Sequence, residues 1–177
     1  MNITFRWYGR NNDTVTLDHI RQIPNVKGIV WSLHDKQAGE LWTKDEIKEE
    51  VEYIQSKGFH TDVVESVNVH EDIKLGTGKR DEYIENYKQT IRNLAEFGVK
   101  VICYNFMPIF DWTRTDLFHP LEDGSTALYF DKEKVQNLEP QALVETVNEA
   151  SDLTLPGWES ERLAHLKELF EAYKNVD

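Results

Sequence analysis

Residues 80–106 have the sequence RDEYIENYKQTIRNLAEFGVKVICYNF, which contains the signals of a helix, a turn and a strand in one run. Apolar residues recur at three- and four-residue spacing up to Leu94, so the pattern predicts a helix over 80–97 with one apolar face. Gly98 suits the end of a helix, and the β-branched and aromatic run after it predicts a strand over 100–106. A helix that leads directly into a strand is the repeating unit of an α/β fold.

The same order of helix, turn and strand occurs twice more upstream. Thr43 to Glu46 have the form of a capping box, so they predict the start of a helix over 44–57. A shorter apolar stripe follows the cap residue Thr16, and Pro24 ends it. With the first segment of the chain, the predicted strands lie at 3–8, 28–33, 60–67 and 100–106.

Each predicted strand is separated from the next by one helix, an arrangement that favours a parallel sheet with right-handed crossovers. An open sheet and part of a (β/α) barrel both satisfy this rule, and four strand-helix units make about half of an eight-stranded barrel. Residues 107–139 then break the rhythm, so we expect an irregular insertion there, followed by helices near 140–151 and 160–174. No linker divides the chain, and we therefore expect a single domain over 1–177.

The chain carries 32 acidic and 20 basic residues, a formal net charge of −12. The resulting field repels polyanions, so we expect neither nucleic acid nor an anionic membrane surface as a partner. The single cysteine, Cys103, cannot form an intramolecular disulfide, and no apolar run is long enough to span a membrane. We therefore expect a cytoplasmic protein without a secretory leader.

Polar and ionisable residues stand at the carboxyl end of every predicted strand. In parallel α/β folds these ends meet at one mouth, where functional groups gather. Helices cover the outer face of the sheet, so a charged side chain that pointed outward would be buried without a partner. We therefore expect these side chains to face the mouth. The candidates are Arg6, Tyr8, His34, Glu65 and Asn105, followed by Trp112 and Arg114 after the last strand.

Structural roles are open for several of these residues. Arg6 and Glu65 could form an internal ion pair, and His34 could be a loop histidine with satisfied hydrogen bonds. Trp112 and Arg114 offer an aromatic plane and a guanidinium, which together suit a polyol that carries an acid group. An ion pair within the loop explains this last segment nearly as well.

A further signal lies in four segments: MNITFRWYGRNNDTVTLDHIRQIPNVKGIVWSLHD at 1–35, VVESVNVHEDIKLG at 63–76, RDEYIENYKQTIRNLAEFGVKVICYNFMPIFDWTRTDL at 80–117 and LEDGSTALYFD at 121–131. Together they closely resemble the N-terminal half of bacterial mannonate dehydratases, and the likeness runs through essentially all of the chain. The resemblance implies a (β/α)₈ TIM barrel of the xylose-isomerase-like type, with this chain covering about the first four βα units.

The resemblance also implies an activity. Mannonate dehydratases are cytoplasmic hydro-lyases of hexuronate (glucuronate) catabolism, which convert D-mannonate to 2-dehydro-3-deoxy-D-gluconate with Fe²⁺ or Mn²⁺. Their metal ligands are expected outside this chain, so we assign no metal ligand here and interpret Cys103 as a small core residue of its strand. The expected partners are the sugar acid and further copies of the chain in a homo-oligomer.

The residues present would then form the substrate-side wall of the mouth, with Tyr8 among them. We expect Arg6 or Arg114 to contact the substrate carboxylate and Trp112 to act as a lid or stacking surface. No general base or acid is assigned within the chain. The hydroxyl contacts are expected from His34, Glu65 and Asn105.

Two other functions are open at this point. A metal-dependent sugar isomerase or epimerase would share the barrel and a mouth that grips a polyol. A non-catalytic half-barrel, by contrast, would contribute only packing surface, because its two edge strands and an apolar face would be left for another chain to cover.

Overall fold

The computed structural model describes residues 2–106, 114–135 and 168. The chain divides into two compact units, Met1–Phe106 and Met107–Asp177, and each is described by itself. The single domain predicted from the sequence remains a prediction. Among the described residues, no helix combines the length and the apolar character that crossing a bilayer requires.

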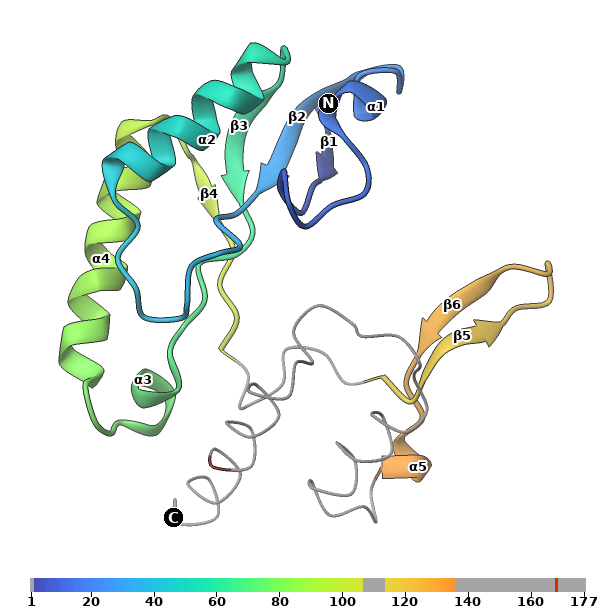
Figure 1. Ribbon diagram of the computed structural model, residues 1–177. Helices are drawn as coiled ribbons and strands as arrows, with labels where there is room; N and C mark the ends of the chain where they lie inside the picture. Colours follow the sequence, from blue (N-terminus) through green and yellow to red (C-terminus); the bar gives the residue numbers. More distant parts are fainter. Residues whose placement is uncertain (1, 107–113, 136–167, 169–177) are drawn as a thin grey trace. The chain divides into compact units, whose positions relative to one another are not determined.

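A four-stranded parallel sheet forms the centre of the first unit (Figure 1). Its strands lie side by side in the order of the sequence, and every neighbouring pair is parallel. This arrangement agrees with the predicted α/β class and parallel sheet. Three of the ladders are shorter than the predicted strands, because the polar residues at their carboxyl ends leave the regular pairing, and β2 (Val26–Trp31) has the predicted length but begins two residues earlier. The strands are β1 (Ile3–Arg6), β2 (Val26–Trp31), β3 (His60–Val64) and β4 (Val101–Ile102).

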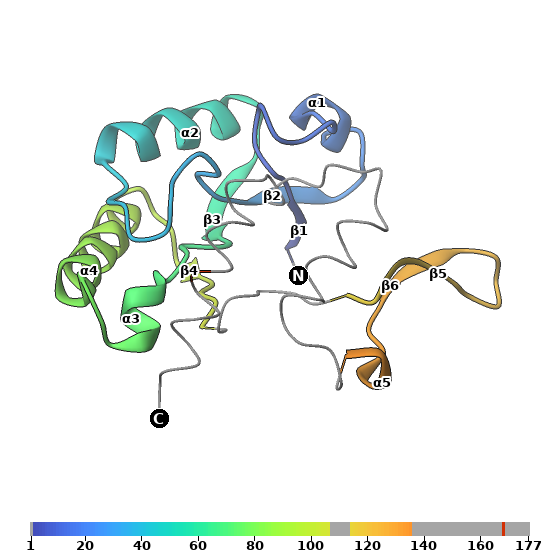
Figure 2. The ribbon, with the colours of Figure 1, turned by 60° about the horizontal axis from the view of Figure 1, so that its bottom comes forward.

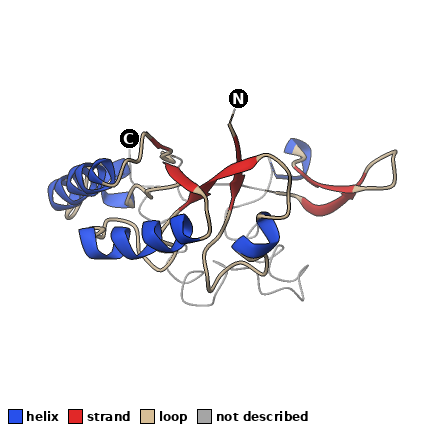
Figure 3. Cartoon of the chain, turned by 90° about the horizontal axis from the view of Figure 1, so that it is seen from above, coloured by secondary structure: helices blue, strands red, loops and turns tan. Residues whose placement is uncertain are grey.

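Helices connect the strands and cover one face of the sheet. In Figures 2 and 3, α1 and α2 lie on the same side of the strands, and α4 packs beside α2. Parallel strands need such crossovers, since a tight turn cannot return the chain to the end where the previous strand began. The short helix α3 was not predicted. The helices are α1 (Leu17–Ile20), α2 (Lys44–Ser56), α3 (Glu71–Leu75) and α4 (Arg80–Glu96).

The ends of α2 show why sequence signals predict this helix well. The N–H of Glu46 donates to Thr43 Oγ1 at 3.4 Å, and the N–H of Thr43 donates to Glu46 Oε2 at 2.9 Å, so the predicted capping box is present. At the other end, Gly58 has φ of +88°, in the left-handed region that favours glycine. The buried apolar residues of α2 are Ile47, Val51 and Ile54.

Alternation along β2 decides which face of the sheet carries Arg6. Ile29 and Trp31 are buried beneath the helices, and the indole N–H of Trp31 donates to the Thr61 carbonyl at 3.1 Å. Side chains alternate between the two faces of a strand, so Val30 points to the face without helices. Arg6 is the register partner of Val30 and shares that face. The side chain of Arg6 therefore points away from the helices that cover the other face of the sheet.

The second unit contains a β-hairpin where the sequence predicted irregular structure over 107–139. Strands β5 (Asp116–Pro120) and β6 (Thr126–Tyr129) are antiparallel, and the helix α5 (Lys132–Val135) follows. The turn between the strands closes through a hydrogen bond from the Leu121 N–H to the Ser125 carbonyl at 2.9 Å. The helices predicted near 140–151 and 160–174 lie outside the described residues, except for Glu168, which is helical.

Candidate functional site

An ion pair joins the carboxyl ends of β1 and β3. Arg6 Nε lies 3.6 Å from Glu65 Oε2, and Arg6 Nη1 donates to the Trp7 carbonyl at 2.8 Å. Burial lowers the pKa of Arg6, while the neighbouring Tyr8 and Glu65 act in the opposite direction. An arginine remains charged even so, because its ordinary pKa is far above neutrality. The site therefore contains a half-buried cation held against an accessible carboxylate.

Tyr8 continues this cluster from the loop after β1. Its ring stacks on the guanidinium, with Arg6 Cζ 4.6 Å from the ring centroid, and it lies 5.6 Å from the ring of His34. The backbone N–H of Tyr8 donates to Asp13 Oδ2 at 3.0 Å, and Asp13 Oδ1 accepts from the Val15 N–H at 2.8 Å. Asp13 therefore fixes the turn that places Tyr8 over Arg6.

His34 is the ionisable group that follows β2. Burial lowers its pKa, and the positive charge of Arg6 lowers it further, whereas Asp35, a hydrogen bond with the Trp7 backbone and Asp13 oppose the shift. The Nε2 atom of His34 is buried and has no hydrogen-bond partner within the part of the chain that the structure describes. His34 is therefore held as a neutral imidazole, whose ring can offer one donor and one acceptor.

Hydrogen bonds connect the end of β3 to the segment that follows β4. Asn105 Nδ2 donates to Ser66 Oγ at 3.4 Å, and Ser66 Oγ donates to Asn68 Oδ1 at 2.7 Å. From β2, Ser32 Oγ donates to the Ser66 carbonyl at 2.9 Å. Because Ser66 follows Glu65 directly, these bonds bring neutral polar groups beside the ion pair.

Five of the seven predicted site residues thus meet at one end of the sheet. They do so because parallel strands with helical crossovers bring all their carboxyl ends to one edge. Trp112 lies outside the described residues, and Arg114 belongs to the second unit, which is described by itself. Asp13 was not among the predicted site residues, although an Asp in a polar loop often accepts from the backbone N–H two residues on, as in an Asx-turn. The five are Arg6, Tyr8, His34, Glu65 and Asn105.

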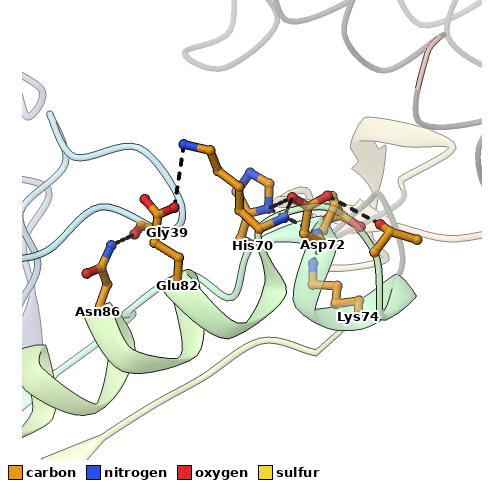
Figure 4. Close-up of polar contacts among 9 residues, drawn as sticks. Gly39, His70, Asp72, Lys74, Glu82 and Asn86 are labelled. Carbon is orange, nitrogen blue, oxygen red and sulfur yellow. Dashed lines mark hydrogen bonds and ion pairs between the residues drawn. The ribbon is translucent and has the colours of Figure 1, made fainter.

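Side chains of α4 hold the loop between β2 and α2 through hydrogen bonds to the backbone of that loop. Asn86 Nδ2 donates to the Gly39 carbonyl at 2.9 Å (Figure 4), and Asn93 Nδ2 donates to the Trp42 carbonyl at 2.8 Å. The N–H of Trp42 donates in turn to Thr90 Oγ1 at 3.1 Å. These three α4 side chains lie three and four residues apart, so they share one face of the helix. This face therefore holds the loop that begins at the end of β2.

The turn between α3 and α4 is closed by a carboxylate. Asp72 Oδ2 accepts from the Lys79 N–H at 2.9 Å, and His70 Nδ1 accepts from the Asp72 N–H at 3.0 Å as the cap of α3 (Figure 4). The His70 ring also packs on Tyr83, with ring centroids 4.0 Å apart. The carboxylate occupies the position at the start of α4 where an anion would otherwise bind. His70 and Asp72 thus have structural roles.

No group of three or more His, Cys, Asp or Glu side chains among residues 2–106, 114–135 and 168 could hold a metal ion. Cys103 is a free, half-buried cysteine in the segment after β4, and its N–H donates to the Val64 carbonyl at 2.9 Å. The described residues therefore do not fit a metal centre, and the cluster offers contacts for a polar ligand instead.

Over its whole length, the chain is similar to proteins of one enzyme family. The model of the family described as D-mannonate dehydratase (UxuA) matches residues 1–177. The mannonate dehydratase of Bacillus subtilis (strain 168) is 72% identical over 177 residues, which are 100% of this chain and 49% of that protein. The mannonate dehydratase of Shouchella clausii (strain KSM-K16) is 61% identical over 176 residues, which are 99% of this chain and 49% of that protein.

A solved structure agrees with these relatives. The crystal structure of mannonate dehydratase from Streptococcus suis serotype 2 is similar with a TM-score of 0.75 at 42% sequence identity. The match covers 99% of this chain and 50% of the chain in that crystal structure. The chain thus spans about half the length of the curated relatives it matches.

Proposed function

Because the chain belongs to the D-mannonate dehydratase (UxuA) family, we propose that the protein containing it removes water from D-mannonate to give 2-dehydro-3-deoxy-D-gluconate. The observation that carries this proposal is the meeting of Arg6, Tyr8, His34 and Glu65 at the carboxyl end of a parallel sheet. Such an edge is where α/β enzymes bind their substrates. The names of the relatives favour a dehydratase over a sugar isomerase or epimerase.

We also propose that the sheet is part of a xylose-isomerase-like (β/α)₈ barrel, with this chain covering about the first four βα units. Two features support this proposal. The strands lie in sequence order without the reversal that marks a doubly wound sheet, and the helices lie on one side of them. A cytoplasmic location and a homo-oligomeric assembly are proposed with it, and sedimentation of the purified enzyme tests the assembly.

The reaction explains why the cluster consists of polar and mostly uncharged groups. Dehydration removes a weakly acidic proton from C2 of the sugar acid and expels the C3 hydroxyl, a poor leaving group, so the substrate must be held in one orientation. The proposed metal, Fe²⁺ or Mn²⁺, would stabilise the charge that develops beside the carboxylate. The described residues do not fit that metal, so we assign them substrate contacts alone. We propose these contacts for Tyr8, His34, Glu65 and Asn105, with Arg6 paired to Glu65 beside them. Contacts of Trp112 and Arg114 with the substrate stay a prediction from the sequence.

An assay of the active enzyme tests the proposed reaction. With D-mannonate and Mn²⁺ or Fe²⁺, we expect a 2-keto acid, which semicarbazide traps as a chromophore. An isomerase or epimerase would instead convert a keto sugar without releasing a 2-keto acid from D-mannonate. Turnover of the keto sugar with no product from D-mannonate would overturn the proposed function.

A further inference from the structure

The guanidinium of Arg6 is largely committed to other groups of the protein. Nη1 donates to the Trp7 carbonyl at 2.8 Å and to the Val30 carbonyl at 3.4 Å, while Nε faces Glu65 at 3.6 Å. An arginine binds a carboxylate best through two parallel N–H groups on one edge of its fork. Each such edge of Arg6 contains at least one N–H with a protein partner. Arg6 is therefore poorly placed to bind the carboxylate of a sugar acid.

The charges around the pair also disfavour a carboxylate ligand. Arg6 and Glu65 balance each other, while Asp13 and Asp35 are further carboxylates that act on His34, and Asp13 acts on Arg6 as well. Burial and Arg6 keep His34 neutral, so it adds no positive charge. The described charges around this cluster would therefore repel a substrate carboxylate. An uncharged hydroxyl would meet no such repulsion.

The groups left accessible suit hydroxyls. Glu65 remains 45% exposed after pairing with Arg6, so its oxygens can accept hydrogen bonds from a ligand. The amide of Asn105, which contacts Ser66, can still donate and accept, whereas the Ser66 hydroxyl already donates to Asn68. Each hydroxyl of a sugar both donates and accepts hydrogen bonds, so a site that binds several hydroxyls needs donors and acceptors side by side.

From these contacts we infer that Glu65, oriented by Arg6, and Asn105 bind the hydroxyl groups of the sugar acid at the end remote from its carboxylate. The carboxylate is bound outside this cluster. The inference rests on the proposed function and adds the orientation of the substrate to it. Of the two arginines considered for the carboxylate, Arg6 is then a positioning residue that acts through Glu65.

Glu65→Gln in the active enzyme tests this orientation, because glutamine keeps the shape of the side chain and removes its charge. Asp62→Asn is a matched control in the middle of β3, away from its carboxyl end. Asp62 is also 45% exposed and also forms an ion pair at 3.6 Å, with Lys100. Two ligands are compared: D-mannonate as substrate, and D-glycerate as an inhibitor that has the carboxylate without the remote hydroxyls. Thermal unfolding of both variants shows whether each remains folded.

We expect Glu65→Gln to raise KM for D-mannonate by about 10-fold or more, the effect of weakening hydrogen bonds to a charged acceptor. The inhibition constant of D-glycerate should stay within about 2-fold of the parent value, as should both constants in Asp62→Asn.

Several outcomes would overturn the orientation while the parent still dehydrates D-mannonate. These are an unchanged KM in Glu65→Gln, an equal loss of D-glycerate and D-mannonate binding, or a parent enzyme that D-glycerate does not inhibit. A folded Asp62→Asn with the same loss would also overturn it. A parent enzyme that gives no 2-keto acid from D-mannonate would instead overturn the proposed function.

Discussion

Arg10 Nη2 lies 2.8 Å from Glu50 Oε2, and this contact ties the loop after β1 to α2. The carboxylate belongs to a side chain only 10% exposed, whereas Glu49, the other partner of Arg10 at 3.0 Å, is 73% exposed. The Arg10 guanidinium also stacks on Tyr53, 4.6 Å from the ring centroid. The same loop carries Tyr8, so this pair helps to hold one wall of the candidate site.

Arg10→Leu is expected to lower the free energy of unfolding by about 2–4 kcal/mol, because it leaves the Glu50 carboxylate buried without its partner. Glu49→Ala removes an exposed partner of the same arginine and should cost under about 1 kcal/mol. Urea unfolding measures both. The double variant Arg10→Leu with Glu50→Leu should recover most of the loss, and equal costs for Arg10→Leu and Glu49→Ala would contradict the assignment.

His34 makes stability depend on pH in a defined direction. Burial, followed by the charge of Arg6, lowers the pKa of His34 in the folded state, so the folded protein binds fewer protons than the unfolded chain. The stability from neutral His34 is therefore present above about pH 6.5, the ordinary pKa of histidine, and is lost as pH falls below it. His34→Gln should reduce the fall in unfolding free energy between about pH 7 and pH 5. A parent and a variant with the same pH dependence would refute this role.

Gly39 is expected to be much less tolerant of alanine than Gly58, although both have positive φ, +87° and +88°. A Cβ on Gly39 would lie 2.6 Å from Cδ1 of Tyr83, whereas nothing lies within 4 Å of a Cβ on Gly58. Gly58→Ala should cost about 1–2 kcal/mol from backbone strain alone. Gly39→Ala should cost about 3 kcal/mol or more, since overpacking adds to that strain. Similar melting temperatures for the two variants would show that Tyr83 yields without cost.

Sequence patterns predicted the parts of the fold that depend on local signals. The capping box at Thr43 and the apolar spacing in 80–97 lie within single helices, and α2 and α4 end within one residue of their predicted bounds. The parallel order of the strands brings their carboxyl ends to one edge of the sheet, and the pleat determines which face each side chain occupies. That is why Arg6 and Glu65 could be placed together before any coordinates.

Other features were not predicted, for different physical reasons. The hairpin of β5 and β6 was missed because its strands are short and its main signal, a turn around Gly124, lies outside the repeating order of helices and strands. Asp13 was missed because an Asp in a polar loop indicates a turn, but it does not show that this turn places Tyr8 over Arg6. The commitment of Arg6 to carbonyl groups of the protein is likewise visible only in three dimensions.

The most direct test of substrate binding at the carboxyl ends of the strands is kcat/KM for D-mannonate in four single variants of the active enzyme. Glu65→Ala and Asn105→Ala change that end of the sheet, and Asp62→Ala and Lys100→Ala remove an exposed ion pair between the middle of β3 and the residue before β4. We predict a loss of about 10-fold or more for the first two and values within about 2-fold of the parent for the controls. Four variants that all stay within a few-fold of the parent would contradict the account.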